Sequence, residues 1–440
     1  MYELLTDDER LGLLDGDTPL WHALREAATD GYNARPYEHG EVARLRIPRT
    51  RFVDGPRGCV SGHGTAFRWR WRVGRRGISS WRKRSVRRSA ARCERRAATS
   101  SVACASTCCA IRRGVGRRRP YGDDPVHLGE LGAALARGVG QYAMACVKHS
   151  ALNSIENARF IVDLEVDEAT LHDVYMPHLK RVIDEGSSAV TASYNSVNGE
   201  WMGQGHPMLT GVLRDLWQFT GMTATDAVWG MRNGAAALEA GMDLEELFSQ
   251  THATHLRNQL KAGKTSWETV ERSGVRIQAT RLRSYAARSE PPPWIELMAR
   301  ESHRALAGEV AAKAVVLLSN DLLDGQPVLP PTADVASIAV IGRLATAASM
   351  GDSAHPTSGH QKPCQRPRRH PRRLPRRNRH PRHVAIDVSL LALAEWDPDR
   401  RRRVAPSIGG ISLHVGAHAH DPASIVIDRR DTNGNRPGGR

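Results

Sequence analysis

The sequence is poor in aromatic residues and lacks the patterns that mark several large classes of protein. Only 5% of its 440 residues are aromatic, and five of them are Phe. No apolar run reaches the 18 or more residues that a membrane-spanning helix needs. The opening stretch MYELLTDDER is acidic, whereas a signal peptide carries a basic end followed by an apolar stretch. We therefore expect a cytoplasmic protein with no membrane association.

Cysteine is also scarce, and its spacing is not that of a disulfide framework. There are seven Cys, an odd number, and no CxxC pair, which fits free thiols in a reducing compartment. Two clusters have ligand-type side chains, namely Cys93, Cys104, Cys108 and Cys109, and His414, His418 and His420. The first lacks the paired spacing of zinc sites, and the second fits a chance cluster in an unstructured tail. We expect no metal.

Acidic residues are nearly absent from two stretches. Between Arg68 and Arg119 there are 17 Arg and one Lys against a single acid, Glu94. From Gln361 to Arg440 there are 18 basic residues against seven acidic ones. The formal net charge of +16 therefore arises in these two stretches, and the rest of the chain is acidic on balance.

Both basic stretches lack the periodicity of a folded segment. They show neither a 3.6-residue apolar stripe nor alternation with period two, and the second repeats Pro and Arg. Such enrichment in Arg, Pro, Ala and Ser is what a GC-rich gene yields when it is translated out of frame. We hypothesise two frameshifted segments, which would require compensating insertions or deletions near codons 67, 120 and 355. The alternative is a nucleic-acid-binding arm in which Trp69, Trp71 and Trp81 stack on bases between phosphate-binding arginines.

The remaining sequence alternates between helix-like and strand-like segments. The expected helices cover 127–140, 167–186, 206–219 and 232–241, and the expected strands cover 143–149, 188–195, 221–226 and 242–245. Gly140, Gly186 and Gly241 end three of these helices, as C-terminal caps prefer. The alternation predicts an α/β fold with a parallel sheet, either a (β/α)8 barrel or an open doubly wound sheet.

Polar residues at the strand ends favour the barrel. They are Lys148 with His149, Tyr194 with Asn195, Asp226, and Asp243 with Glu245. In a barrel the carboxyl ends of all strands meet at one face, so we expect these side chains to converge in one pocket. A Rossmann site would need a glycine-rich phosphate-binding turn, and the sequence contains neither GxGxxG nor GxxxxGK[ST].

Several separate motifs then resemble one enzyme family. They are LLTDDERLGLLDGDTPLW, VDGPRG, YGDDP, KHSALNSIENARF, LHDVYMPHLKRVIDEG, TASYNSVNG, LTGVLRDLWQFTGMTATD, AALEAGMDLE, VAAKAVVLLSNDLLDGQPVLP and IAVIGR. In this order they resemble glycoside hydrolase family 3, the β-glucosidase type, over residues 4–66 and 121–352. The resemblance stops where the Arg-rich stretches begin.

The resemblance implies a domain layout with an incomplete TIM-type barrel followed by the start of an αβα sandwich domain. The expected parts are 1–67, the N-terminal part of the barrel domain; 68–119, an aberrant or disordered insert; 120–290, the barrel domain; 291–352, the start of the sandwich; and 353–440, a disordered Arg/Pro-rich tail. Because an arc of the barrel would be missing, we expect exposed sheet edges and poor solubility.

The resemblance also implies a retaining mechanism, in which one carboxylate is the nucleophile and a second carboxyl group is the acid/base. Asp226 matches the family's nucleophile. Without the resemblance, an Asp after a strand is as readily an N-cap of the following helix. Family members commonly have an aromatic residue directly after this Asp, and here Ala227 follows.

Five further residues match the family's sugar-binding positions, namely Asp54, Lys148, His149, Arg159 and Tyr194. Taken in isolation, Lys148 would be read as a solvent-exposed side chain and His149 as a core histidine. Ser150 replaces the Phe usual after the Lys-His pair. No acid/base can be assigned, since Glu395 is the only Glu beyond residue 309 and lies in unmatched sequence.

The sequence therefore predicts a glycoside hydrolase that cleaves β-linked glucosides, with no cofactor and with a small carbohydrate as its partner. Two alternatives remain open: a catalytically inactive remnant of such an enzyme, and a basic nucleic-acid-binding protein.

Overall fold

The structure is a computed structural model of the chain, and it describes the greater part of residues 2–287 together with later segments. The described residues are 2–31, 35–55, 100–105, 121, 124–155, 158–287 and 301–313, scattered positions between 315 and 329, and four strands between 395 and 428. The chain divides into two units, Met1–Arg372 and Arg373–Arg440. Every residue of the expected site lies in the first unit.

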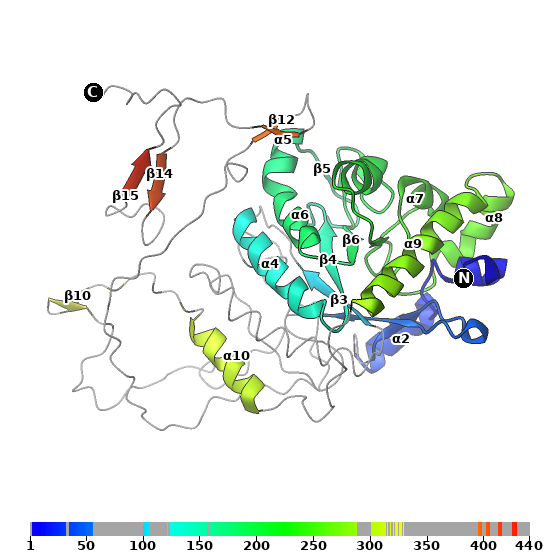
Figure 1. The fold of residues 1–440 in the computed structure, drawn as a ribbon, viewed down its shortest axis with the longest axis horizontal. Coiled ribbons are helices and arrows are strands. Elements are labelled where there is room, and N and C mark those ends of the chain that lie inside the picture. Colours follow the sequence, from blue (N-terminus) through cyan, green and yellow to red (C-terminus); the bar gives the residue numbers. More distant parts are fainter. Residues whose placement is uncertain are drawn as a thin grey trace. The chain divides into compact units, whose positions relative to one another are not determined.

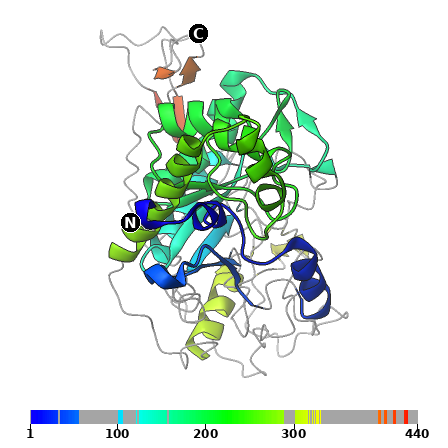
Figure 2. The ribbon, with the colours of Figure 1, turned by 90° about the vertical axis from the view of Figure 1, so that its right-hand side faces the viewer.

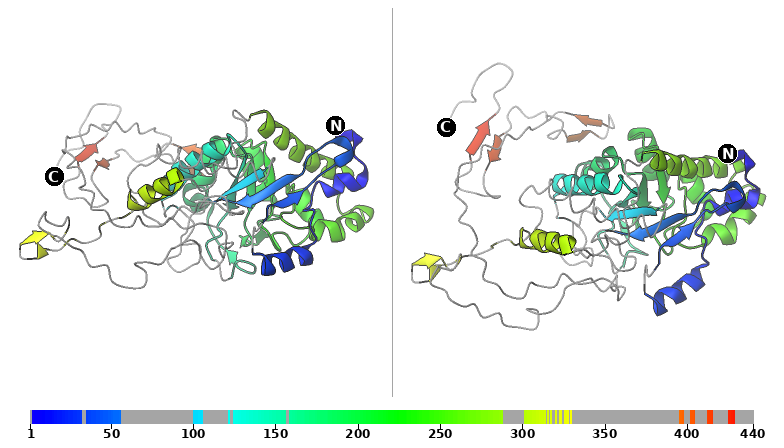
Figure 3. Two further views of the ribbon diagram at one scale, coloured as in Figure 1. Left: turned by 90° about the horizontal axis from the view of Figure 1, so that it is seen from below. Right: turned by 60° about the horizontal axis from the view of Figure 1, so that its bottom comes forward.

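A six-stranded sheet forms the centre of the first unit (Figure 1). Its strands are, in spatial order, β1 (Tyr37–His39), β2 (Thr50–Asp54), β3 (Ser100–Ala105), β4 (Met144–Ser150), β6 (Ala189–Ala192) and β9 (Met222–Ala224). β1 is antiparallel to β2, and the others run parallel to their neighbours. The spatial order follows the chain order without reversal, which is typical of a barrel, because a doubly wound sheet reverses direction at its switch point. Figure 3 shows the blue strands β1 and β2 continuing the sheet beside β3 and β4.

Backbone hydrogen bonds continue the sheet beyond β9 and return it to β1. Leu244 donates its N–H to a carbonyl of β9 over 3.1 Å, and Glu245 donates to Leu14 O over 2.9 Å. Asp17 then donates to a carbonyl of β1 over 3.0 Å. The N-terminal segment thus lies between the region after β9 and β1, and helix α1 (Asp7–Gly12) packs against helices from the second half of the barrel sequence (Figure 2). The expected missing arc is not confirmed.

Helices pack around this sheet, and several of them begin at a side-chain cap. The helical elements of the first unit are η1 (Tyr2–Leu4), α1, α2 (Leu20–Thr29), η2 (Ala43–Leu45), α4 (Pro125–Val139), α5 (Glu168–Thr170), η6 (Leu171–Tyr175), α6 (Pro177–Asp184), η7 (Pro207–Leu216), α7 (Gly234–Ala240), η8 (His252–Leu256), α8 (Arg257–Lys261), α9 (Trp267–Ala286) and α10 (Glu301–Lys313). Asp124 caps α4 by accepting the N–H of His127, and Ser266 caps α9 by accepting that of Thr269. Each such cap stabilises a helix by about 1 kcal/mol.

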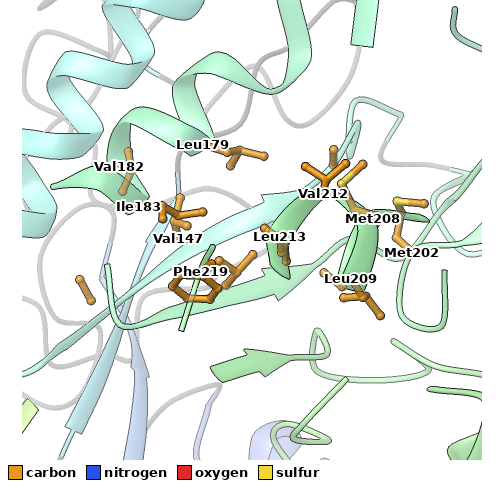
Figure 4. Close-up of a cluster of buried hydrophobic side chains, with 14 of the residues drawn as sticks. Val147, Leu179, Val182, Ile183, Met202, Met208, Leu209, Val212, Leu213 and Phe219 are labelled. Carbon is orange, nitrogen blue, oxygen red and sulfur yellow. The ribbon is translucent and has the colours of Figure 1, made fainter. Parts of the chain in front are cut away.

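The largest apolar cluster lies between the sheet and helices α4, α6 and η7. Alternate residues of β4 point to opposite faces, so Ala145 and Val147 join this cluster while Met144 and Cys146 join a second one. Figure 4 shows the meeting of strand and helices at Val147, Leu179, Val182, Ile183, Leu213 and Phe219. Lys148 lies on the same face as Cys146 by this alternation, so the strand that builds the core also places a charge at its carboxyl end.

Some of the Arg-rich and C-terminal segments contain described elements, and others lie outside the described residues. Residues 100–105, inside the stretch expected to be an aberrant insert, form β3 between β2 and β4. Residues 68–99 and 106–119 lie outside the described part, as does most of 314–352. Where the start of a sandwich was expected, the structure has α10 and a hairpin of β10 (Leu322–Leu323) and β11 (Gln326–Pro327).

The second unit, in the range expected to be a disordered tail, contains two hairpins. β12 (Glu395–Asp397) pairs with β13 (Arg402–Val404), and β14 (Ser412–Val415) pairs with β15 (Ile425–Asp428), both antiparallel. In the first unit a small sheet of β5 (Asp163–Leu164), β7 (Ser196–Val197) and β8 (Glu200–Trp201) lies apart from the main one. Among the described helices, none has the length and hydropathy needed to cross a membrane.

Candidate active site

Asp226 follows β9 at the carboxyl-terminal edge of the sheet. Its side chain is 12% exposed, so solvent reaches it. One carboxylate oxygen, Oδ2, lies 2.7 Å from His149 Nε2, and the other accepts the N–H of Ala227 over 2.8 Å. His149 and Asp226 come from β4 and from the end of β9, with β6 between them in the sheet.

Asp226 is not the N-cap of the following helix, the role that an Asp after a strand can also have. The next helix along the chain, α7, begins at Gly234, and its N-cap is Asn233, whose side chain accepts the N–H of Ala236 over 3.1 Å. Asp226 lies seven residues before that cap and contacts His149 instead. Its carboxylate is therefore held by the site and not by a helix terminus.

Lys148 and Asp54 form a buried ion pair next to this carboxylate. Lys148 Nζ lies 2.8 Å from Asp54 Oδ1, with the two side chains 4% and 2% exposed. The ammonium also lies 5.7 Å from the centre of the Phe52 ring, within cation–π distance. Lys148 is thus a buried site residue and not a solvent-exposed one, and it comes together with Asp54 and His149 as the resemblance implied.

The charges around Asp226 fix its protonation state. Burial by itself would raise the pKa of Asp226, but the positive charges of Lys148 and His149 and the hydrogen bonds from His149 and Ala227 hold that pKa well below its usual range. This is the effect of opposite charges close to a carboxyl group. Asp226 is therefore a carboxylate at neutral pH and below.

Tyr194 and Arg159 complete the group of sequence-predicted residues. Burial, followed by the negative charge of Asp226, raises the pKa of Tyr194 well above its usual value, so its hydroxyl stays protonated and hydrogen-bonds Asp226. The guanidinium of Arg159 lies 4.4 Å from the centre of the Tyr194 ring. The six residues that match the family's site positions are thus brought to this edge of the sheet, namely Asp54, Lys148, His149, Arg159, Tyr194 and Asp226.

An aromatic series leads from the buried site to the surface. The Phe160 ring meets the Tyr194 ring edge-on at 4.8 Å and the Trp229 ring edge-on at 5.9 Å. Trp229 is 55% exposed. Trp229 lies three residues after Asp226, and its exposed ring offers a surface on which a sugar can stack. Ala227, directly after Asp226, is the position at which family members commonly have an aromatic residue.

Two of the acidic residues expected to converge here do not join the site. Asp243 is fully buried and binds Arg214 (3.1 Å) and Arg276 (2.6 Å) from η7 and α9. Because Thr223 also donates its N–H to Asp243, this carboxylate ties the strand to the helix layer. Glu245 accepts the N–H of His252 over 2.8 Å, at the start of η8. The convergence expected at the fourth strand is therefore wrong for these two side chains.

The structure instead brings in a neighbour that sequence reasoning missed. Glu246 is 3% exposed and interacts electrostatically with Lys148, Asp226 and Asp54. The sequence feature that could have predicted this is the position of Glu246, which directly follows the strand-like run MDLE and lies two residues after Leu244. A period of two along a strand puts Leu244 and Glu246 on the same face.

Other features of the described part do not point to a metal or to a second chemical centre. Among the described residues no three His, Cys, Asp or Glu side chains are grouped so as to hold a metal ion. Cys93, Cys108, Cys109, His418 and His420 lie outside those residues. A surface hollow of about 570 Å³ includes none of the site side chains, and it is lined by Leu152, Leu164, Glu165, Val166, Asp167, Thr170, Tyr175 and Asn198.

Comparison with known proteins shows which family has a similar sequence. Residues 109–280 match the glycosyl hydrolase family 3 N terminal domain. These residues belong to glycosyl hydrolase family 3. The matched range contains Lys148, His149, Arg159, Tyr194 and Asp226.

Related sequences are glycosidases by name. A β-glucosidase of Rhizobium radiobacter is 30% identical over 336 residues, covering 72% of this chain and 40% of that protein. An exo-α-(1→6)-L-arabinopyranosidase of Bifidobacterium breve is 28% identical over 246 residues, covering 54% of this chain and 32% of that protein. The chain thus spans less than half the length of these curated relatives.

Solved structures show the same fold for the family 3 domain. β-Glucosidase 3B from Thermotoga neapolitana, solved in complex with glycerol and with glucose, superposes with a TM-score of 0.63 at 23% identity, covering 72% of this chain and 47% of that one. The fold class expected from the sequence, a TIM-like α/β domain, is consistent with this likeness.

Proposed function

We propose that this protein is a glycoside hydrolase that cleaves β-linked glucosides by a retaining double displacement, with Asp226 as the nucleophile. The observation that carries the proposal is the state of Asp226: a carboxylate kept ionised by Lys148 and His149, at the carboxyl end of a barrel strand and still 12% exposed. A nucleophilic carboxylate must be unprotonated before it can attack an anomeric carbon.

The surrounding groups suit an oxocarbenium-like transition state. His149 and Tyr194 both hydrogen-bond the carboxylate, which fixes its orientation. Lys148 and Asp54 provide a charged donor and a charged acceptor, and charge-assisted hydrogen bonds to sugar hydroxyls are the strong ones. Positioning and electrostatic stabilisation of this kind supply much of the rate enhancement in glycosidases.

The names of the relatives support a sugar substrate and leave the sugar itself to be tested. One relative is named a β-glucosidase and another an arabinopyranosidase, and a structural neighbour was solved with glucose. We propose a β-glucoside because the β-glucosidase match covers the largest share of this chain among these relatives. The smaller arabinopyranosidase match makes aryl arabinosides the natural comparison substrate.

The test is hydrolysis of 2,4-dinitrophenyl β-glucoside by the purified full chain, beside its Asp226→Ala variant. Labelling with 2,4-dinitrophenyl 2-deoxy-2-fluoro-β-glucoside and mass spectrometry then identifies the modified residue. We expect hydrolysis by the parent chain, loss in Asp226→Ala, and the label on the peptide containing Asp226. Asp184→Ala removes a carboxylate that is 51% exposed on α6 and is the matched control. A folded chain that shows no turnover and no labelling would refute the proposal.

A further inference from the structure

A second carboxyl group stands beside Asp226 at the same edge of the sheet. Ala224 bridges Leu244 in parallel register, so two residues further along, Asp226 and Glu246 occupy equivalent positions on adjacent segments. The Thr225 side chain links these segments, since its hydroxyl donates to Glu246 O over 3.2 Å and accepts the Glu246 N–H over 3.1 Å. The backbone that carries Glu246 is thus fixed to the residue that precedes Asp226.

The environment of Glu246 opposes ionisation, in contrast to that of Asp226. Burial, together with the negative charges of Asp226 and Asp54, raises the pKa of Glu246 to about 8 against the opposing effect of the Lys148 ammonium. Within the described part of the chain no hydrogen bond reaches the Glu246 carboxyl group, whereas Asp226 takes up the bond from His149. The group is therefore a neutral acid at pH 7 whose proton is not engaged by the protein.

Two other carboxyl groups with raised pKa values have structural partners instead. Asp15 is buried facing Glu245, and it accepts hydrogen bonds from backbone N–H groups near the start of η8. Asp17 accepts the N–H of Gly40 over 2.9 Å. Besides burial, the charge of Glu245 raises the pKa of Asp15 and that of Glu38 raises the pKa of Asp17, whereas the charges that raise the pKa of Glu246 are those of Asp226 and Asp54.

A pair of carboxyl groups whose surroundings push their protonation states apart is how retaining glycosidases divide the roles of nucleophile and acid. The proposed double displacement needs such an acid beside the nucleophile. Glu246 and Asp226 lie on adjacent segments of the same sheet region in the first unit.

We propose that Glu246 is the acid/base residue of this glycosidase, an inference that rests on the proposed function. In the first step an oxygen of Asp226 bonds to the anomeric carbon while the bond from that carbon to the glycosidic oxygen breaks. The bonding electron pair goes to that oxygen, which takes the Glu246 proton and leaves as an alcohol. In the second step the Glu246 carboxylate takes a proton from water, whose oxygen bonds to the anomeric carbon as the Asp226 ester bond breaks. The sugar leaves, and both residues regain their starting states.

The experiment compares the full chain with Glu246→Gln and Glu246→Ala on two aryl β-glucosides. Departure of 2,4-dinitrophenolate needs no proton, whereas departure of phenol does. We expect kcat/KM for the phenyl glucoside to fall by about 10²- to 10⁴-fold in Glu246→Gln, and that for the dinitrophenyl glucoside to fall less than about tenfold. Azide should restore turnover of the dinitrophenyl glucoside by Glu246→Ala and yield β-glucosyl azide. The basic limb of the parent's kcat/KM profile, near pH 8, should be lost in Glu246→Gln.

The outcomes separate this inference from the proposed function. Equal losses on both substrates, without azide rescue, would overturn the acid/base role and leave Asp226 as the nucleophile. No turnover by the parent chain and no fluoro-sugar label on Asp226 would overturn the proposed function and the acid/base role with it. Labelling of Asp226 in Glu246→Gln by the dinitrophenyl fluoro-glucoside verifies that this variant folds. Glu309→Gln, which removes a carboxylate from the surface of α10, is the matched control.

Discussion

Lys148 is the residue that most directly sets the charge of the site, since its ammonium lies in the Asp54 ion pair and its positive charge lowers the Asp226 pKa. Replacing it with Met removes the positive charge and keeps the side-chain length. We expect the Asp226 pKa to rise and the acidic limb of kcat/KM to move to higher pH. We also expect a loss of stability, because Asp54 would become an unpaired buried carboxylate.

The pH–rate profile and chemical unfolding of Lys148→Met measure both effects. Lys180→Met is the control, since it removes an ammonium that is 37% exposed on α6. It should change neither the pH–rate profile nor the midpoint of chemical unfolding by a measurable amount. An acidic limb at the same pH in Lys148→Met and the parent chain would contradict the electrostatic role assigned to Lys148.

Glu246 makes a prediction about stability that does not depend on catalysis. Its folded pKa is about 8, above the ordinary value of 4.5, so the folded state holds a proton that the unfolded chain has lost between these pH values. Stability should therefore fall as pH rises through this window, by up to about 1.4 kcal/mol per pH unit. In Glu246→Gln this contribution to the slope should disappear, making the variant more stable than the parent at pH 8 but not at pH 4. Urea titrations at both pH values measure this, and identical slopes would contradict it.

The residues of the site were predictable from the sequence where a motif carried them. Lys148, His149 and Asp226 stand in recognisable patterns, and the structure brings them together. Glu246 could not be assigned because its importance comes from register with Asp226 across two segments and from burial, and a single sequence displays neither. Asp243 was misassigned for the same reason: its position fits the strand-end pattern, but its side chain faces the helices.

At the scale of elements, Asp243 joins β9 to η7 and α9. It is fully buried between Arg214 and Arg276 and accepts the N–H of Thr223. Asp243→Asn keeps the shape but removes the charge, which leaves Arg214 and Arg276 without their shared counter-ion. We expect a destabilisation of about 3–5 kcal/mol, as for other broken buried ion pairs. Thermal unfolding measures it, with Asp184→Asn on the exposed surface of α6 as the control. A midpoint within one degree of the parent's would show that the two arginines find other partners.

Strand prediction was right for three of the four expected strands and failed where backbone geometry is irregular. β6 and β9 lie inside the expected segments, and β4 extends one residue past its expected end, because continuous apolar runs mark buried parallel strands. The strand expected over 242–245 is reduced to an isolated bridge between Ala224 and Leu244. The single helix expected over 167–186 is divided into α5, the π-helical η6 and α6. Pro177 explains the last boundary, since it lacks the N–H that a continuing helix would need and fits the first turn of a new one. β3 was missed because its residues, SSVACA, are small and are held by pairing on both sides.

At the scale of the whole molecule, the candidate site and its supporting elements lie within the first unit. We expect a chain truncated after Arg372 to keep its thermal transition and its fluoro-sugar labelling, because the second unit contributes none of the site residues. Truncation after Ala287 also removes α10, whose Leu306 and Val310 pack against Leu128. Losing that contact should lower stability by about 1.5–3 kcal/mol for each larger side chain that is no longer buried. Calorimetry of the two truncated chains tests this, and a large loss in the first would refute the division.

The contact between the N-terminal segment and the region after β9 has a consequence for the timing of folding. Leu14 accepts its hydrogen bond only when Glu245 is present, roughly 230 residues later in the chain. At a synthesis rate of about 5–20 residues per second, the N-terminal segment waits on the order of 10–50 s for its partner. Because contacts over such a separation form late, the first strands lack this partner throughout synthesis. The ribosome-bound chain, more than the finished one, is therefore the form in which this protein is exposed to aggregation and to chaperones.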